Sequence, residues 1–457
     1  MSRTHISPNA LRVLYRLREG GFQAFLVGGC VRDLLIGLEP KDFDVATDAL
    51  PEEIKKLFRN CRLVGRRFRL AHVFFGRDII EVATFRAATA PSAGEDPLPD
   101  ADADGDEVVD AEEESELPLD VILAEHASDS ERVFDKSGRI VRDNVYGTID
   151  ADVWRRDFTA NALYYNIADF SIWDYVNGLE DVHARRLRLI GDPETRFRED
   201  PVRMLRAARF EAKLGFEIDP ATAEPIKRLR GLLAGVPPAR LFDETLKLFL
   251  SGHGAQSLEV LRRRGLFATL MPSVDKYLSS HPGSLVEKLL IQGLRNTDAR
   301  ARADKPITPT FLFALMLYGP IAQTIEAMPS SRWHEIGAIL DACDRAVREL
   351  QRHISIPRRF SLGVREMFAL QPRLEHPRGK RAMRALEHPR FRAAYDLLLL
   401  RAEHGLAPQE IADWWTRIQE ADSDERARMI DAIAVQGEGT RRGPRQRRRR
   451  RRPTQAT

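Results

Sequence analysis

The chain has 457 residues, 43% of them hydrophobic, and its 71 basic and 68 acidic residues leave a formal net charge of +3. This length exceeds what one hydrophobic core usually organises, so it predicts two to four domains, and the apolar fraction suffices for globular folding. The longest apolar run, residues 311–318, is too short to cross a bilayer, which excludes a membrane-spanning segment there and predicts a buried helix.

Cysteine usage and the N-terminal residues both bear on the compartment. Cys30, Cys61 and Cys343 lie far apart and match neither a zinc motif nor a disulfide framework, which favours a reducing environment. The first 21 residues lack the uninterrupted apolar core of a signal peptide. We therefore expect a cytoplasmic protein without a membrane partner.

Two opposed charge blocks lie behind the small net charge. Residues 441–452 contain nine arginines, whereas residues 95–131 contain sixteen acidic residues and no lysine or arginine. The rest of the chain is therefore basic. A basic body with an arginine-rich tail predicts a polyanionic partner, most often a nucleic acid; the alternative is a tail that only keeps the chain soluble.

The N-terminal part predicts an α+β unit. Helical spacing over residues 8–20 ends at two glycines, and it is followed by an apolar strand, the Gly28-Gly29 turn, a short helix and a second strand that carries Asp42 and Asp44. A further helix is expected from Pro51 to residue 58. Predicted strands at 61–64, 70–75 and 79–84 complete a small, partly antiparallel sheet with helices alongside.

The composition changes between residues 87 and 137, where Asp, Glu, Ala, Pro and Ser dominate. This bias predicts a disordered acidic insertion in a hairpin-like connection, which is either a solvated loop or a flap that mimics RNA and competes with substrate. Regular structure is expected again from Gly138. Segments 172–176 and 187–190 are predicted to form the last pair of short strands.

Helical spacing dominates from residue 192 to residue 432. Asp200-Pro201 and Asp219-Pro220 each have the pattern of an N-cap followed by proline at the first helical position. We predict a helical neck at 191–260, a helical body at 261–432 and a disordered arginine-rich tail at 433–457.

The first group of candidate site residues surrounds the second strand. Because side chains alternate along a strand, Asp42 and Asp44 are expected on one face, where two carboxylates attract a divalent cation; such pairs also cap turns or bind calcium. The Gly28-Gly29 turn allows close approach of a phosphate, and Arg32 adds a positive charge one helical turn later. Glu81 is either a third carboxylate of a two-cation site or a rim residue paired with an arginine.

The second group places two arginines beside two aspartates at a predicted helix start: Asp152, Arg155, Arg156 and Asp157. These side chains could hold phosphate or sugar hydroxyls. Structural ion pairing explains the same residues, so both interpretations stay open.

The third group lies on the helix predicted to begin at Pro201. Arg203, Arg206 and Arg209 recur every three residues, which favours one slowly turning basic stripe. Asp200 and Arg203 lie one turn apart. The carboxylate as acceptor and the forked guanidinium group as donor could together hydrogen-bond to the edge of a nucleobase. The alternative role of Asp200 is the helix cap itself.

Together these groups resemble the class II tRNA nucleotidyltransferase and bacterial poly(A) polymerase superfamily, over roughly residues 6–260. The matching motifs are LVGGCVRDLL, KDFDVAT, RRDFTANALYYN and REDPVRMLRAARF. The resemblance implies that Asp42 and Asp44 bind Mg²⁺, and that residues 1–190 form the catalytic head. It further implies that the nucleotide is held by Gly29, Arg32 and Arg156 and selected in the neck by Asp200, Arg203 and Arg206. It makes Asp157 an essential acid, which competes with Glu81 as the third carboxylate.

Three further features resemble the poly(A) polymerase branch: LVGRRFRLAHV at 63–73, EHPRFRAAYDLL at 387–398 and the arginine-rich tail. The expected activity is addition of adenosine from ATP to RNA 3′ ends, with the body binding RNA and with RNA-decay proteins as further partners. The alternatives are a CCA-adding tRNA nucleotidyltransferase and a catalytically idle RNA-binding scaffold. The long acidic insertion departs from the pattern.

Overall fold

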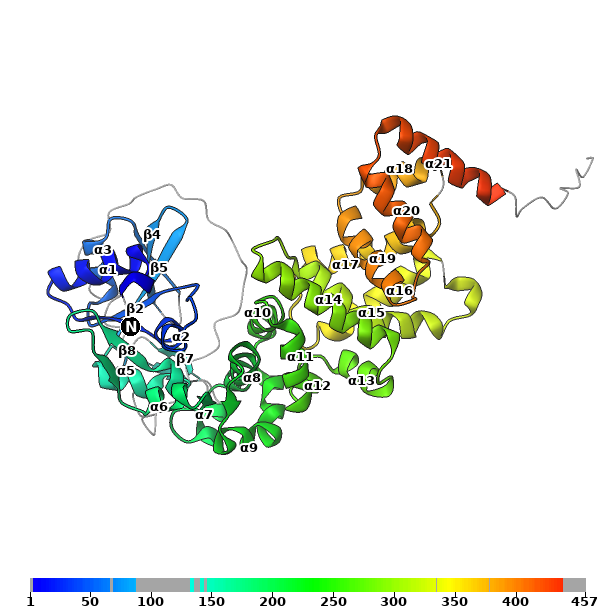
Figure 1. Cartoon of the computed structure of the whole chain (residues 1–457). Coiled ribbons are helices and arrows are strands. Elements are labelled where there is room, and N and C mark those ends of the chain that lie inside the picture. The colour runs from blue at the N-terminus through cyan, green and yellow to red at the C-terminus, as the bar shows by residue number, and fades with distance from the viewer. Residues whose placement is uncertain are drawn as a thin grey trace, which may run out of the picture. The chain divides into compact units, whose positions relative to one another are not determined.

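The structure is a computed structural model, and it describes residues 3–65, 69–87, 132–134, 140–143, 146–333, 335–377 and 379–438. A sheet-containing N-terminal part is followed by helices, which confirms the predicted α+β class (Figure 1). The chain divides into two compact units. The first comprises Met1–Val236 and Glu259–Thr269, and the second comprises Pro237–Leu258 and Leu270–Thr457.

The first unit is built on a seven-stranded sheet with the order β3-β4-β5-β2-β1-β8-β9. Strand β1 is antiparallel to β2 and β8, whereas β2 is parallel to β5. The strands are β1 (Ala24–Val27), β2 (Asp44–Thr47), β3 (Cys61–Val64), β4 (Leu70–Phe75), β5 (Asp78–Thr84), β8 (Leu163–Asn166) and β9 (Ile172–Asp174). The strands predicted up to residue 84 are confirmed, except that β2 begins at Asp44 and Asp42 precedes it.

Both faces of this sheet are covered, which explains why all four residues of β1 are buried. Helix α1 (Pro8–Glu19) packs its apolar side on β1, β2 and β5, and helix α3 (Pro51–Leu57) begins at the predicted proline. On the other face, Phe25 and Val27 join a core with Phe85 and Tyr164. Full burial of such side chains contributes about 1.5–3 kcal/mol each, so β1 is held firmly in place.

The end of the sheet differs from its prediction. Strand β9 pairs with β8, whereas β10 (Arg186–Leu187) pairs in parallel with β11 (Glu217–Ile218), so the predicted pairing of 172–176 with 187–190 is wrong. The cause is a tight turn: the Asp174 carboxylate accepts hydrogen bonds from the amides of Gly178 and Leu179 at 2.9 Å, which starts helix α6 (Gly178–His183) directly after β9.

The connection that contains the acidic segment is only partly described. Strand β6 (Arg132–Phe134) pairs with β7 (Ile140–Asp143), so regular structure resumes at Arg132 and not at Gly138. Residues 88–131 lie outside the described residues, as do residues 66–68 of the LVGRRFRLAHV motif. The chain re-enters the first unit through α5 (Ile149–Arg155) and the short helix η2 (Thr159–Asn161). At the N-terminus, η1 (Arg3–His5) precedes α1.

The helices that complete the first unit follow the sheet. They are α7 (Pro193–Glu199), α8 (Val202–Leu214), α9 (Pro220–Leu229), η3 (Arg230–Gly235) and α12 (Phe267–Leu270), while α11 (Gly254–Arg263) runs from the second unit into the first. Asp219 caps α9 as predicted, with its carboxylate accepting the Ala221 amide. Asp200, in contrast, is the C-cap of α7, and Pro201 takes the N-cap position of α8.

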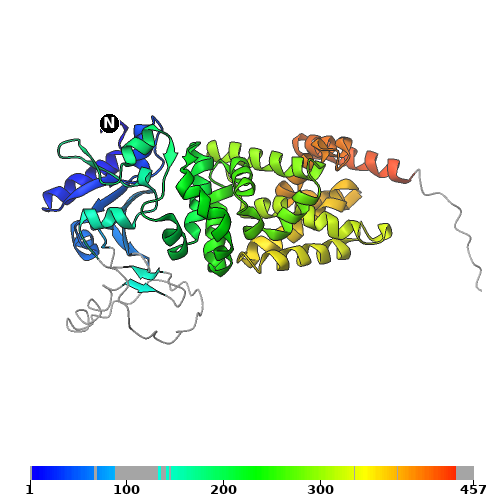
Figure 2. The same cartoon turned by 90° about the horizontal axis from the view of Figure 1, so that it is seen from below.

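The second unit consists of helices, as predicted for residues 261–432 (Figure 2). Helix α15 contains the apolar run 311–318, which is buried except for the half-buried Phe311, and it continues through Pro320. The helices are α10 (Pro238–Phe249), α13 (Pro272–Ser280), α14 (Leu285–Arg302), α15 (Pro309–Glu326), η4 (Ser330–Arg332), α16 (Ile336–Leu350), α17 (Arg358–Glu375), α18 (Gly379–Leu386), α19 (Phe391–Glu403), α20 (Gln409–Glu420) and α21 (Ser423–Glu438). No helix in the described ranges is long and apolar enough to cross a membrane.

The head, neck, body and tail boundaries inferred from the sequence stay a prediction. The structure divides the chain between Val236 and Pro237, inside the predicted neck. The disordered tail predicted from residue 433 is wrong at its start, because helix α21 (Ser423–Glu438) continues to Glu438. The rest of the predicted tail, residues 439–457, lies outside the described part of the chain.

Candidate active site

A pocket of about 260 Å³ in the first unit gathers most of the candidate residues. It lies between the sheet end that bears the Gly28-Gly29 turn, the segment around Arg156, and helix α8. The predicted residues that line it are Gly28, Gly29, Arg32, Asp42, Asp44, Arg156, Asp157 and Arg206. Glu81, Asp200 and Arg203 do not line it, although Glu81 is adjacent to Asp44 across the sheet.

The glycine turn requires glycine at its first position. Gly28 has φ +79°, which L-residues with a side chain rarely adopt, and it is the N-cap of the short helix α2 (Gly29–Leu35). This conformation turns the buried strand β1 sharply into α2. Arg32, one turn later, is thereby directed to the pocket wall.

The two aspartates differ in their surroundings. Asp44 opens β2 and is half-buried between Val27 of β1 and Glu81 of β5, whereas Asp42 is exposed. Burial raises the pKa of Asp44 to about 6; repulsion from Glu81 and Asp42 adds to the shift, and the Arg156 guanidinium opposes it. Glu81 pairs with His72, at 3.5 Å between Nε2 and Oε1, and among the residues that the structure describes it has no arginine partner.

These carboxylates fit a hard divalent cation such as Mg²⁺, which prefers oxygen ligands and usually keeps water or substrate phosphate in its shell. A cation would relieve the repulsion that raises the pKa of Asp44. Asp42 and Asp44 would hold it. Within the described residues, no group of three or more His, Cys, Asp or Glu side chains is arranged to bind a metal, so the remaining ligands would come from water and substrate.

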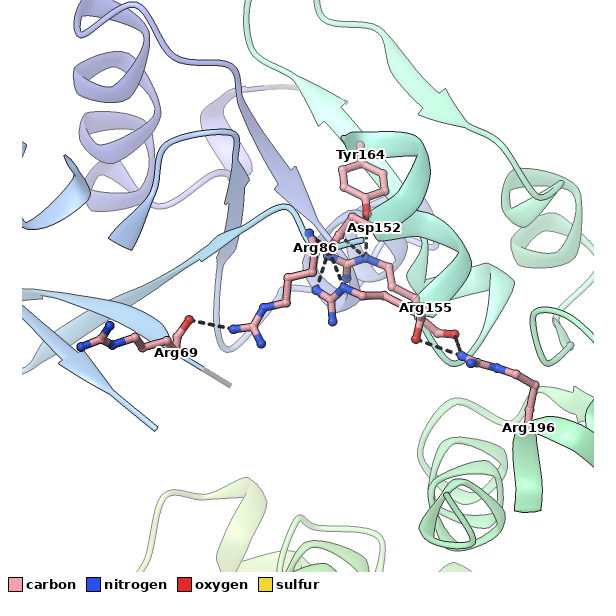
Figure 3. A network of polar contacts seen from close by, with 7 residues as sticks. Arg69, Arg86, Asp152, Arg155, Tyr164 and Arg196 are labelled. Atoms are coloured by element: carbon pink, nitrogen blue, oxygen red, sulfur yellow. Dashed lines mark hydrogen bonds and ion pairs between the residues drawn. The ribbon is translucent and has the colours of Figure 1, made fainter. Parts of the chain in front are cut away.

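A buried network of hydrogen bonds is centred on Asp152 (Figure 3). Arg156 is fixed by its hydrogen bonds to this carboxylate. Its Nη2 donates to Asp152 Oδ2 at 2.9 Å and its Nε donates to the Tyr164 hydroxyl at 2.7 Å. Asp152 is 1% exposed and also accepts from Arg155 Nε and Tyr164. Burial alone would raise the pKa of Asp152, but Arg156 and Arg155 outweigh it and lower the pKa.

The predicted helix start at this motif is wrong, because α5 ends at Arg155. Arg155 and Arg156 therefore stand at a helix C-terminus, where the helix dipole favours positive charge. Their carbonyl oxygens accept hydrogen bonds from Arg196 Nη2 at 2.9 and 2.6 Å, which ties α7 to the motif. Figure 3 shows Arg196 reaching towards Arg155 from the neighbouring helix.

Arg32 is almost wholly enclosed, with 2% of its surface exposed. Its Nε and Nη2 donate to Asp33 Oδ1 at 2.8 and 2.6 Å, and its Nη1 donates to Asn161. The guanidinium carbon also lies 5.4 Å from the centroid of the Phe210 ring. Arg32 therefore links α2, the RRDF motif and α8.

Asp157 joins the same motif to α8 through an ion pair. Arg206 donates from Nε and Nη2 to Asp157 Oδ2, at 2.8 and 2.5 Å. Burial would raise the pKa of Asp157, but Arg206 and the Phe158 amide outweigh it and lower the pKa to about 2. Asp157 is therefore ionised at any physiological pH and neutralises Arg206.

The three arginines of α8 do not form one exposed stripe. Arg203 is buried and donates from Nη1 to the Arg196 carbonyl at 2.7 Å and to Glu199 at 3.0 Å. A spacing of three residues advances about 300° around an α-helix, so successive arginines diverge by about 60°. Arg206 alone of the three lines the pocket, and Asp200 accepts the Val202 amide.

Sequence reasoning missed six lining residues: Cys30, Asp33, Lys41, Asn161, Phe210 and Lys213. Three of them carried a signal. Phe210 and Lys213 follow Arg206 by four and seven residues, which is the spacing of one helix face. Lys41 directly precedes Asp42 in the KDFDVAT motif.

Comparison with solved structures identifies the class of fold. A tRNA nucleotidyltransferase complexed with a primer tRNA and an incoming ATP analogue matches with a TM-score of 0.54 and 21% identity, over 89% of this chain and 98% of that one. A tRNA-processing enzyme in its apo form I matches with a TM-score of 0.56 and 20% identity, over 95% and 98%. The chain therefore has the nucleotidyltransferase fold.

Sequence comparison identifies the family. Family models match for the "Poly A polymerase head domain" at 24–188, the "Probable RNA and SrmB-binding site of polymerase A" at 215–278 and the "Polymerase A arginine-rich C-terminus" at 331–454. Poly(A) polymerase I of Salmonella typhi is 45% identical over 95% of this chain and 87% of its own length, and that of Haemophilus influenzae is 43% identical over 93% and 87%. The chain belongs to the poly(A) polymerase I family.

Relatives from the CCA-adding branch are more distant. The CCA-adding enzyme of Bacillus subtilis is 32% identical over 57% of this chain and 55% of its own length. The similarity to the poly(A) polymerases thus extends through the second unit. The similarity to this CCA-adding enzyme covers just over half of the chain.

Proposed function

We propose that this protein is a template-independent polymerase that adds adenosine from ATP to RNA 3′ ends and releases pyrophosphate. The observation that carries the proposal is the pocket itself, in which Asp42 and Asp44 line the same space as three arginines and two lysines. Carboxylates suit a catalytic cation, and the cationic wall suits a triphosphate. Membership of the poly(A) polymerase I family supports adenosine as the nucleoside.

The chain's own residues would position the reactants. When bound at Asp42 and Asp44, Mg²⁺ would supply charge stabilisation at the α-phosphate and lower the pKa of the RNA 3′-hydroxyl. Gly28 and Gly29 leave room for phosphate beside the backbone. Arg156, held by Asp152 and Tyr164, supplies a fixed charge at the pocket wall. Glu81 remains our candidate for a third carboxylate that attracts the cation through its charge, because it is the register partner of Asp44, while water and substrate would supply the remaining ligands.

We assign nucleotide choice to Asp200, which ends α7, and to Arg203 and Arg206 in α8. Arg206 lines the pocket, and Asp200 and Arg203 lie within two turns of it. We infer that these residues select adenine, with Arg203 and Asp200 setting the start of α8. Replacement of Asp200 by Ala should reduce the preference for ATP over CTP without abolishing incorporation.

RNA and ATP are the partners that this activity needs, and we place it in the bacterial cytoplasm, where both occur. The arginine-rich segment 441–452 would bind RNA through its phosphates, so its deletion should weaken RNA binding and flatten the dependence of affinity on salt. Unchanged affinity and salt dependence would refute this role. RNA-decay proteins are a further proposed partner class, to be sought by co-purification.

One assay tests the proposed function against its alternatives. The pure protein is incubated with Mg²⁺, each nucleotide singly, and either an oligo(A) primer or a tRNA that lacks CCA. We expect a ladder with ATP on the oligo(A) primer. Incorporation of CTP on tRNA alone would indicate a CCA-adding enzyme, and no product with any nucleotide would indicate a non-catalytic RNA-binding protein.

Two variants control this assay. Asp42→Ala should abolish incorporation with an unchanged circular dichroism spectrum, because Asp42 is exposed and its replacement removes no packing. Glu180→Gln, at an exposed acidic residue of α6 outside the pocket, should retain full activity. Near-normal incorporation by Asp42→Ala would contradict the proposed site.

A further inference from the structure

The arginines that line the pocket already have anionic partners within the protein. Arg32 pairs with Asp33, Arg156 with Asp152, and Arg206 with Asp157, with shortest nitrogen–oxygen distances of 2.6, 2.9 and 2.5 Å. Each of these guanidinium groups thus has a carboxylate beside it before any substrate arrives, although Arg156 shares Asp152 with Arg155. A polyanionic substrate therefore needs other cations to balance it.

Two lysines on the pocket wall are available for this purpose. Lys41 is exposed, lines the pocket and makes no ion pair or hydrogen bond with any residue that the structure describes. The Nζ of Lys213 lies 3.9 Å from Asp33 Oδ2, at the outer limit of an ion pair. The other oxygen of Asp33 accepts two hydrogen bonds from Arg32, so one carboxylate serves two cations.

Arg206 and Lys213 stand about two turns apart along helix α8. Arg206, Phe210 and Lys213 share one face of the helix and all line the pocket. With a rise of 1.5 Å per residue, the backbone positions of Arg206 and Lys213 are about 10 Å apart. The pocket thus has an end with Asp157 and Arg206 and another with Asp33, Lys213 and Lys41.

At the lysine end of the pocket, neighbouring positive charges repel the ammonium group of Lys213. Burial lowers the pKa of Lys213, repulsion from Arg32, Arg209 and Lys41 adds to the shift, and Asp33 opposes it. A bound polyphosphate would supply the missing negative charge and accept hydrogen bonds from both ammonium groups. Lys41 is also the neighbour of Asp42, so a phosphate held by it would lie beside the carboxylates.

We propose that Lys41 and Lys213 bind the β- and γ-phosphates of ATP and hold the pyrophosphate that leaves. This assignment rests on the proposed function, and it adds phosphate binding to a helix otherwise assigned to nucleotide choice. In the reaction, the RNA 3′ oxygen forms a bond to the α-phosphorus as the bond to the bridging oxygen breaks. The hydroxyl proton passes to solvent and the electron pair stays on pyrophosphate, whose growing charge the two ammonium groups neutralise.

The test compares Lys213→Met and Lys41→Met with Lys227→Met, which alters an exposed lysine of α9 outside the pocket. Methionine keeps the apolar stem and removes the charge. Binding of ATP, pyrophosphate and AMP to the full chain is measured by calorimetry without RNA, and the KM for RNA is measured separately. Lys213→Arg serves as the rescue variant.

We expect each pocket variant to weaken ATP and pyrophosphate binding by about tenfold or more, because a hydrogen bond to a charged group is lost. AMP binding and the KM for RNA should stay within about twofold, and Lys213→Arg should restore pyrophosphate binding. Equal losses for AMP and pyrophosphate would reveal a structural role and overturn the proposal. A raised KM for RNA with unchanged pyrophosphate binding would do the same and indicate an RNA phosphate contact.

The proposed function can fail separately from this inference. A wild-type protein that binds pyrophosphate through Lys41 and Lys213 but extends no primer with ATP would refute polyadenylation and leave the phosphate site standing. A protein that extends the primer normally with both lysines replaced would refute the phosphate site alone.

Discussion

Replacing Asp44 by Asn should make the metal-free protein more stable at neutral pH while it removes activity. Asp44 has a pKa near 6 in the folded protein, against 3.8 for an ordinary aspartate, chiefly because it is buried and also because Glu81 and Asp42 repel its charge. The folded state therefore binds this proton more tightly than the unfolded state. Stability falls as the pH rises from about 4 to about 6 and stays at the lower level above that.

The size of the effect follows from the shift in pKa. A difference of about two pKa units corresponds to about 3 kcal/mol, since one unit is 1.36 kcal/mol. Asparagine is neutral at every pH, so at pH 8 the variant should recover up to about 3 kcal/mol. For a domain of this size that raises the melting temperature by roughly 6–12 °C. At pH 4 the wild-type carboxyl group is itself mostly protonated, and the difference should vanish.

Thermal unfolding in the presence of a chelator, followed by circular dichroism at pH 4, 6 and 8, measures this difference. Glu180→Gln controls for the loss of a surface charge. Adding Mg²⁺ at pH 8 should raise the melting temperature of the wild type and leave Asp44→Asn unchanged, because a ligand stabilises only the state that binds it. A variant that melts at or below the wild-type temperature at pH 8 would refute the reasoning.

Two further substitutions test the walls of the pocket. Asp152→Asn should lower the free energy of unfolding by about 3 kcal/mol and raise the KM for ATP, because it leaves two arginines beside a neutral group with 1% exposure. Calorimetric melting would check the first effect and steady-state kinetics the second. Gly28→Ala and Gly37→Ala should each lower the free energy of unfolding by about 1–2 kcal/mol, because φ is +79° and +76° at these positions and a side chain disfavours such angles. Only Gly28→Ala should lower the incorporation rate, because Gly28 lines the pocket and its new methyl group, in ordinary contact with Arg156 Nη1 at 3.8 Å, would take up room proposed for phosphate. Equal rates would count against this turn's role.

Local patterns in the sequence were enough to predict the framework of the pocket. Strand β1, the glycine turn and β5 follow from apolar runs, from a glycine pair and from alternation, all of which act over a few residues. The pairing of Asp44 with Glu81 was within reach for the same reason, because Glu81 alternates with buried Ile80 and Val82. That His72 would face Glu81 depends on strand register and could not be read from the chain.

Helix phase and helix ends were harder to predict. The motif around Arg155 has aspartates before arginines, which is equally compatible with the start or the end of a helix, and the end at Arg155 is decided by the buried contacts of Asp152. The regular arginines of α8 suggested one surface. Tertiary packing instead buries Arg203 against the Arg196 carbonyl and leaves Arg206 for the pocket.

Glu81 and Asp157 were both candidates for the third carboxylate, and their different hydrogen-bond and ion-pair partners suggest different roles. Asp157 is bound by Arg206 through two hydrogen bonds and lies beside the Phe158 amide, so little of its charge is available to a cation. Glu81 is half exposed, its one ion pair within the described ranges is the 3.5 Å contact to His72, and its charge raises the pKa of Asp44. We therefore assign Glu81 to the charge of the cation site. We propose a different role for Asp157: its ion pair with Arg206 fixes the position of that side chain on α8 relative to the sheet.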